Sequence, residues 1–279
     1  MKTIILNSKN VVSGSNNSRY QYNFPTGAVT FKSAKISLSS LSMFYSWFNI
    51  TQAYNNNTYS YKWVDGTTVN ITMPDGFYTV AELNQYLQSV MISNKHYLQG
   101  SSSNLFFIEF QENAVKYAVQ VNLYTVGAVL PAGYVIPAGA TWALNNQAPQ
   151  LIINSNAFRD IIGFNAGTYP TVISNSNVSY TSQFTPQVSP VNSILMACNL
   201  INNNLGNSQI LYSFSPNVQF GSQINVNVPS PIWNEVLDGV YSQFQIQFFD
   251  QDYNPMKIND NSLVIALTVV DDKEIMLYK

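Results

Sequence analysis

The chain has 279 residues, a net charge of −2, 46% hydrophobic and 14% aromatic residues, which excludes a disordered chain and predicts one large or two smaller domains. Its Lys and Arg residues are few and unclustered, so direct nucleic-acid binding is not expected. Charged residues make up 9% of the chain, against about 25% in typical soluble domains, and only Arg159 and Asp160 are charged between Lys116 and Glu235. Because charges cost more to desolvate than amides or hydroxyls, this stretch predicts an assembly subunit more than an enzyme.

The first half of the chain combines short strands with two hairpins. Runs rich in β-branched and aromatic residues, separated by turn residues, predict strands at residues 3–6, 28–41, 59–64, 67–73, 105–110 and 115–123. Asp65-Gly66 is a strong signal for a two-residue hairpin turn, and Glu112-Asn113 marks a second hairpin.

Helix signals are few. Thr79 and Glu82 form a capping box, and apolar residues at helical spacing follow it, so residues 80–91 are predicted to form an amphipathic helix. A second short helix is expected at residues 156–162, capped by Asn156 and ended by Gly163.

The last third of the chain contains only strand signals. The predicted strands cover residues 193–199, 209–214, 223–228, 241–249 and 262–270. Many short strands and little helix indicate a mainly β protein, an all-β sandwich or jelly roll with inserted elements. Because the helices and hairpins lie in the middle, residues 1–50 and 186–279 are expected to form the jelly roll, and residues 51–185 an inserted α+β region.

The run of residues 125–139 is uncharged and rich in Gly, Ala and Pro. Its two Pro and three Gly residues argue against a membrane-spanning helix, so no stable membrane insertion is expected. A contact loop or a tip loop is the favoured interpretation, a loop touching a membrane the weaker alternative. Val129 and Ile136, its bulky members, are candidate interface residues.

Catalytic and metal-binding patterns are weak. His96 is the only histidine, and its neighbours Lys95 and Tyr97 suggest a surface position, so neither a His-based metal site nor a catalytic histidine is expected. Asp250 and Asp252 resemble the opening of a calcium loop, but the Gly and Glu that such a loop requires are missing. With Asp260 nearby, a polar turn is the favoured interpretation and a cation at a subunit contact the alternative.

Arg159 and Asp160 stand alone in the uncharged region. They either cap the short helix or form a buried or inter-subunit ion pair, and we expect a partly buried pair that fixes residues 158–164. Cys198 is the only cysteine, which excludes an internal disulfide and fits a reducing compartment.

Four sequence blocks are similar, in order and spacing, to the penton proteins, the vertex capsid proteins of virophages and related polinton-like viruses. The blocks are Met73-Pro74-Asp75-Gly76-Phe77-Tyr78-Thr79 with the helix behind it, residues 158–164 with Tyr169-Pro170, residues 198–203 with 211–214, and residues 238–241 leading to 249–251 and 263–269. Residues 125–139 have no counterpart in this resemblance.

The resemblance implies an upright jelly roll that forms a homopentamer at the fivefold vertices of an icosahedral capsid. The implied partner is a double-jelly-roll major capsid protein, and the implied location is the virion, assembled in the host cytoplasm. It implies no catalytic residues and no cofactor. The alternative from another class is a jelly-roll spike that binds a receptor or glycan, which exposed Trp63, Trp142 or Trp233 would favour. A glycan-active or metal-dependent enzyme is disfavoured by the single histidine and the scarce carboxylates.

Overall fold

The computed structural model describes residues 1–202 and 209–271. The chain forms two compact units, one made of Met1–Trp47 with Val191–Lys279 and the other of Phe48–Pro190. The sequence predicts two domains, residues 1–50 with 186–279 and residues 51–185. That these are independently folding domains stays a prediction. Asn203, at the end of the third sequence block, lies outside the described residues.

The first unit is a jelly roll. One sheet has the order β1 (Lys2–Leu6), β21 (Val264–Asp271), β4 (Ala34–Phe44) and β17 (Gln223–Asn227), with β18 (Asn234–Glu235) also paired to β4. The other sheet has the order β16 (Ile210–Phe214), β15 (Ile194–Cys198), β20 (Gln243–Phe249) and β2 (Arg19–Asn23). If the eight main strands are lettered B to I along the chain, the sheets read B-I-D-G and F-E-H-C, the order of a jelly roll. The expected fold class is therefore confirmed, and the second unit is inserted between strands D and E.

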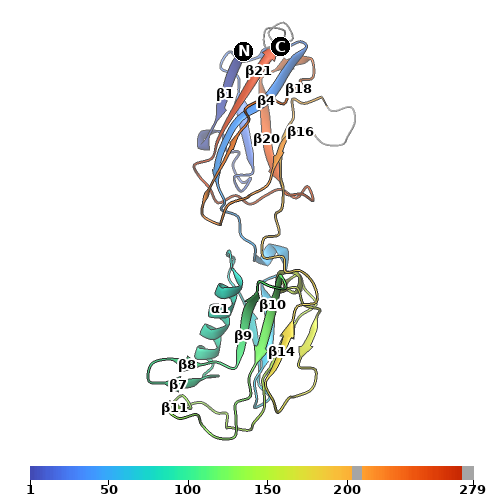
Figure 1. The fold of residues 1–279 in the computed structure, drawn as a ribbon. Helices are drawn as coiled ribbons and strands as arrows, with labels where there is room; N and C mark the ends of the chain where they lie inside the picture. Colours follow the sequence, from blue (N-terminus) through green and yellow to red (C-terminus); the bar gives the residue numbers. More distant parts are fainter. Residues whose placement is uncertain (203–208, 272–279) are drawn as a thin grey trace. The chain divides into compact units, whose positions relative to one another are not determined.

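Alternation of side chains builds the core of the jelly roll. In β20, Phe244, Ile246 and Phe248 are fully buried, while the glutamines between them face outward. In Figure 1, β1, β21 and β4 run side by side as the register of their antiparallel pairs requires.

The predicted strand at residues 28–41 is two strands. β3 (Val29–Phe31) pairs with β19 (Gly239–Tyr241), and β4 begins at Ala34. Between them Ser33 adopts a φ of 50°, and its N–H donates to Asp238 Oδ1 at 2.7 Å. A left-handed residue cannot continue a strand, so the chain changes sheets at this point.

The second unit combines two helices with three small sheets. Its strands are β5 (Thr58–Lys62), β6 (Thr68–Thr72), β7 (Leu98–Gly100), β8 (Asn104–Leu105), β9 (Ile108–Asn113), β10 (Ala118–Leu123), β11 (Tyr134–Val135), β12 (Gln150–Ile153), β13 (Gly167–Tyr169) and β14 (Val178–Thr181). The sheet orders are β13-β12-β5-β6, β14-β10-β9 and β11-β7-β8. Short 3-10 turns at Ser8–Asn10 and Gln52–Tyr54 complete the described elements.

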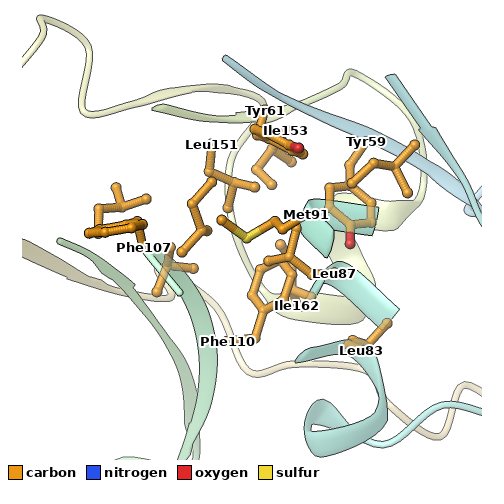
Figure 2. Close-up of a cluster of buried hydrophobic side chains, with 14 of the residues drawn as sticks. Tyr59, Tyr61, Leu83, Leu87, Met91, Phe107, Phe110, Leu151, Ile153 and Ile162 are labelled. Carbon is orange, nitrogen blue, oxygen red and sulfur yellow. The ribbon is translucent and has the colours of Figure 1, made fainter. Parts of the chain in front are cut away.

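The first helix, α1 (Val80–Ser93), lies alongside β9 in the second unit (Figure 1). The predicted capping box is present: Thr79 Oγ1 accepts from the Glu82 N–H, and Glu82 Oε2 accepts from the Thr79 N–H. Its buried face contributes to the core shown in Figure 2, where Met91 lies among Tyr59, Phe110 and Leu151.

The second helix, α2 (Phe158–Ile162), differs from the prediction at its start. The residue at the cap position is Ala157, which has no side-chain cap, although Asn156 Oδ1 still accepts from the Phe158 N–H at 3.2 Å. Gly163 ends the helix with a left-handed φ of 72°, as predicted. The Phe158 ring stacks on Tyr59 at 4.5 Å between centroids, which ties the helix to the core.

Both predicted hairpins form. The Asp65-Gly66 turn has three loop residues instead of two, because the Trp63 N–H donates to the Thr67 carbonyl at 2.7 Å. Gly66, with a φ of 89°, occupies the left-handed position that such a loop needs. The second hairpin joins β9 to β10, but its turn lies at residues 114–117, because Glu112 and Asn113 are the last residues of β9 and pair with Val119 and Ala118.

Candidate assembly surface

Side-chain amides cover the part of the outer face of one jelly-roll sheet that β2 and β20 form. Gln21 Nε2 donates to Gln243 Oε1 at 2.8 Å and to Asn23 Oδ1 at 3.1 Å, while Gln245 Nε2 donates to Gln21 Oε1 at 3.0 Å. At the end of the row, Arg19 Nε donates to Gln247 Oε1 at 3.3 Å. We call these six residues of β2 and β20 the amide ladder. Because these amides already hydrogen-bond to one another, a partner that covers this face leaves few of their donors and acceptors without a hydrogen bond.

The outer face of the other jelly-roll sheet is also poor in charge. Ile5, Phe44 and Val264 are more than a third exposed on it. Ser42 lies opposite Val264 in the sheet register, and its hydroxyl oxygen accepts from Gln223 Nε2 at 2.7 Å. Away from Lys35 and Glu235, which lie opposite each other where β18 pairs with β4, this face offers apolar, hydroxyl and amide groups that can be covered without desolvating an ion.

A second amide network lies on the β14-β10-β9 sheet of the inserted unit. Asn113 donates to Gln120, Gln120 donates to Asn122, and Asn122 donates to Gln111, with distances from 2.8 to 3.3 Å. Ser179 adds a hydroxyl donor to Asn122 at 2.7 Å. The pattern of the jelly-roll face is thus repeated on the second unit.

The two candidate interface residues in the run 125–139 differ in their exposure to solvent. Val129 is 80% exposed, whereas Ile136 is half-buried and packs against the core of the second unit. Lys95 fixes the end of the run, because its Nζ donates to the Gly139 carbonyl at 3.1 Å. Val129 is therefore available for a contact, and Ile136 already contributes to the fold.

The Arg159–Asp160 pair is more exposed than expected. Arg159 Nε lies 3.5 Å from Asp160 Oδ1, and each side chain is 51% exposed, so the expectation of a partly buried pair is wrong. The segment is fixed instead by burial of the apolar residues of α2 and by the backbone. The Phe164 N–H donates to the Arg159 carbonyl at 3.0 Å, and the Gln187 N–H donates to the Asp160 carbonyl at 2.9 Å.

His96 is buried, contrary to the surface position expected from its neighbours. Its ring stacks on Trp63 at 4.6 Å between centroids, and Nδ1 lies 2.8 Å from the Tyr61 hydroxyl oxygen. Burial lowers its pKa to about 4, and the weaker influence of Asp65 acts in the opposite direction. The imidazole is therefore neutral at pH 7 and occupies an aromatic core.

Trp63 and Trp142 are also buried, so neither is an exposed sugar-binding tryptophan, and Trp233 is half-buried. Cys198 is buried as well, and burial raises the pKa of its thiol to about 12, which keeps it protonated.

The carboxylates of Asp250 and Asp260, near the C-terminal strands, accept hydrogen bonds from backbone N–H groups. Asp250 Oδ1 accepts from the N–H groups of Asp252 and Asn254, both at 2.9 Å. Asp260 is buried and accepts from the N–H groups of Phe44 at 2.7 Å and Ser262 at 2.6 Å. Over the described residues, no group of three or more His, Cys, Asp or Glu side chains is placed to hold a metal ion.

No strand is predicted from the sequence at residues 19–23. The prediction therefore misses β2, which supplies three of the six residues of the amide ladder. The available signal was the alternation of Tyr20 and Tyr22 with polar residues. Among the helices that the structure describes, none has the length and apolar character needed to cross a membrane.

The comparisons with solved structures cover nearly the whole chain. The crystal structure of the mavirus penton protein matches 96% of this chain and 97% of its own, with 11% identity and a TM-score of 0.46. A cryo-EM structure of the Sputnik virophage matches 99% of each chain, with 12% identity and a TM-score of 0.35. No protein-family model matches the sequence, and no curated protein does. The jelly-roll assignment rests on the strand order of the chain itself.

Proposed function

We propose that the chain is a structural capsid protein that forms a homopentamer at the fivefold vertices of an icosahedral virion. Its neighbours there would be copies of a double-jelly-roll major capsid protein, and assembly would take place in the host cytoplasm. The role is structural: His96 is buried and neutral, and the Cys198 thiol is buried and protonated.

The observation that carries the proposal is the amide ladder on a jelly-roll face. A fold alone does not identify a function, because jelly rolls serve many. In a free monomer, however, such a face would normally carry Lys, Glu, Asp or Arg. Here Arg19 is the only charged member, and the other side chains hydrogen-bond within the face. The sequence blocks that resemble pentons independently support a subunit role.

A ring of five uses two different patches on each subunit, because a closed ring of more than two copies has heterologous contacts. We propose the amide ladder as one of the patches and the loop around Val129 as a further contact. Arg159 and Asp160 remain candidates for an ion pair with a neighbouring subunit.

The test is the mass of the purified protein, alone and mixed with the major capsid protein, by analytical ultracentrifugation. The proposal predicts a species of about five times the 31.2 kDa subunit. Gln245→Lys and Val129→Lys should abolish it, since each buries an unpaired charge in the contact. Ser213→Lys, on the edge strand β16 and outside the ladder, serves as the control. A wild-type protein that stays monomeric with and without the major capsid protein would refute the proposal.

A further inference from the structure

A groove in the inserted unit has aromatic, amide and carboxylate groups that the assembly role does not use, although Val129 belongs to both. It has a volume of about 600 Å³ and is lined by residues of α1, β8, β9 and β11 and of the loops that follow β8 and β10. The lining combines aromatic rings with amide groups and one carboxylate. Pockets of this size with a few convergent polar groups are the usual form of a small-ligand site.

Three aromatic side chains of the groove are held in place by their neighbours. Phe106 packs on Tyr97 with ring centroids 6.1 Å apart. Tyr134 lies directly over the backbone of Gly100, where a Cβ atom would come within 2.8 Å of the tyrosine ring. Tyr124 donates its hydroxyl hydrogen to Glu109 Oε2 at 3.0 Å. The rings are thus positioned before any ligand binds, which lowers the entropy cost of binding.

The polar groups of the groove have unused hydrogen-bonding capacity. Asn177 Oδ1 accepts from the N–H and hydroxyl of Thr125, but its amide nitrogen donates to no group among the described residues. The side chain of Gln88 likewise has no hydrogen-bond partner within the described part of the chain, and Glu109 uses only one of its carboxylate oxygens there. This differs from the amide ladder, whose groups bond to one another.

The charges around the groove restrict the ligand. Glu109 is the single carboxylate of the lining, and no Lys, Arg or His side chain lines the groove as the structure describes it. Phosphate, sulfate and carboxylate groups would meet a negative charge without a compensating cation. A ligand that fits must supply hydroxyl donors and acceptors together with flat apolar faces.

We propose that this groove binds a neutral oligosaccharide. The apolar C–H faces of pyranose rings would stack on Tyr134 and Phe106. The sugar hydroxyls would donate to Glu109, and they would donate to and accept from the amides of Gln88 and Asn177. The groove is complete within one chain, although the loop around Val129, which is also proposed as a subunit contact, forms part of its lining.

The experiment titrates the full-length protein with neutral oligosaccharides of glucose, mannose and N-acetylglucosamine, followed by saturation-transfer NMR and calorimetry. At least one of them should bind with a Kd of about 1 mM or tighter. Tyr134→Ala and Glu109→Ala should each weaken binding by about tenfold or more. Tyr117→Ala and Glu112→Ala, on the neighbouring hairpin and outside the groove, should leave it unchanged. Thermal unfolding verifies that each variant is folded, and Tyr134→Phe, which keeps the stacking ring, should retain affinity.

Four outcomes would overturn the proposal, and the first three concern sugar binding. These are no binding by any of the three neutral sugars, binding that the groove variants leave intact, and a preference for a sulfated oligosaccharide. Preferential binding of a lysine-rich peptide that Glu109→Ala abolishes would also overturn it, and would assign the groove to a cationic peptide. The oligomeric state does not enter any of these readouts, so failure here leaves the capsid proposal standing.

Discussion

Burial sets the protonation of His96, and this has a consequence for stability. The ordinary histidine pKa is 6.5, and burial between Trp63 and Tyr61 lowers it to about 4 in the folded chain. Between these values the unfolded chain binds a proton that the folded chain does not. Stability is therefore lost as the pH falls from 6.5 and stops changing, for this group, below about 4.

We predict that the unfolding free energy of the wild-type protein falls with decreasing pH by up to about 1.4 kcal/mol per unit between pH 6.5 and 4.5. His96→Gln, which cannot titrate there, should be nearly flat over the same window. Urea unfolding at several pH values measures the slope. Because His96 is the only histidine, one NMR titration of its ring reports the pKa directly. A ring that titrates near 6.5 in the folded protein would contradict the buried geometry.

The exposure of the Arg159–Asp160 pair changes what its removal should do. At 51% exposure of each side chain, the pair contributes about 0–1 kcal/mol, whereas loss of a buried partner would cost roughly 3–5 kcal/mol. We predict that Arg159→Ala leaves thermal unfolding of the dissociated protein nearly unchanged but lowers the yield of the assembled species. Lys116→Ala, an exposed cation on the hairpin turn, should affect neither quantity. An equal yield of the assembled species for Arg159→Ala and wild type would show that the pair does not contribute to the interface.

Among the helices and strands, those that are determined by neighbouring residues are the ones that the sequence predicts. The capping box of α1 and the Gly163 stop are recognisable because a few adjacent residues decide them. β20 was recognisable from its strict alternation. The strand β12 was missed because its four residues follow Pro149 and show no alternation, and β2 was missed because its stability comes from pairing with β20, more than 200 residues away.

The candidate site was harder to predict than the fold. The uncharged composition was visible in the sequence, but the amide ladder arises from the register between β2 and β20. His96 next to Lys95 looked like a surface residue because sequence does not show that Trp63 and Trp142 close over the end of α1. The groove likewise depends on the positions of Tyr124 and Tyr134, which a single sequence leaves open.

The inserted unit has its two ends joined by one side chain, which bears on the proposed domain division. Asn49 Nδ2 donates to the Val188 carbonyl at 2.7 Å and to the Tyr78 carbonyl at 2.8 Å. Termini that lie close together and a separate core are typical of an inserted domain.

We predict that a fragment spanning residues 48–190 folds by itself with a cooperative thermal transition. Asn49→Ala should lower its stability by about 1–3 kcal/mol, because it removes a buried side chain that donates to two carbonyls and accepts from the Tyr78 N–H. Asn145→Ala, which removes an exposed hydrogen bond to the Val64 carbonyl, is the matched control and should cost less. Circular dichroism and urea unfolding measure both, and a fragment without a cooperative transition would argue that the insertion depends on the jelly roll.

The whole molecule consists of a jelly roll and a unit inserted between its D and E strands, and few of its residues are charged. Subunit contacts built from amides, hydroxyls and apolar side chains contain few ion pairs. Salt should therefore screen little of their interaction energy. A kosmotropic salt such as sulfate should strengthen them through the hydrophobic contribution.

The most direct test is sedimentation of the assembled protein across a series of sodium chloride concentrations, from about 0.05 to 1 M, where the Debye length falls from roughly 14 to 3 Å. The account predicts a species of about five subunits that persists over the whole series and that sodium sulfate reinforces. Dissociation at moderate sodium chloride would show that charge pairs hold the subunits together, and would contradict the role assigned to the amide ladder and the other charge-poor contacts.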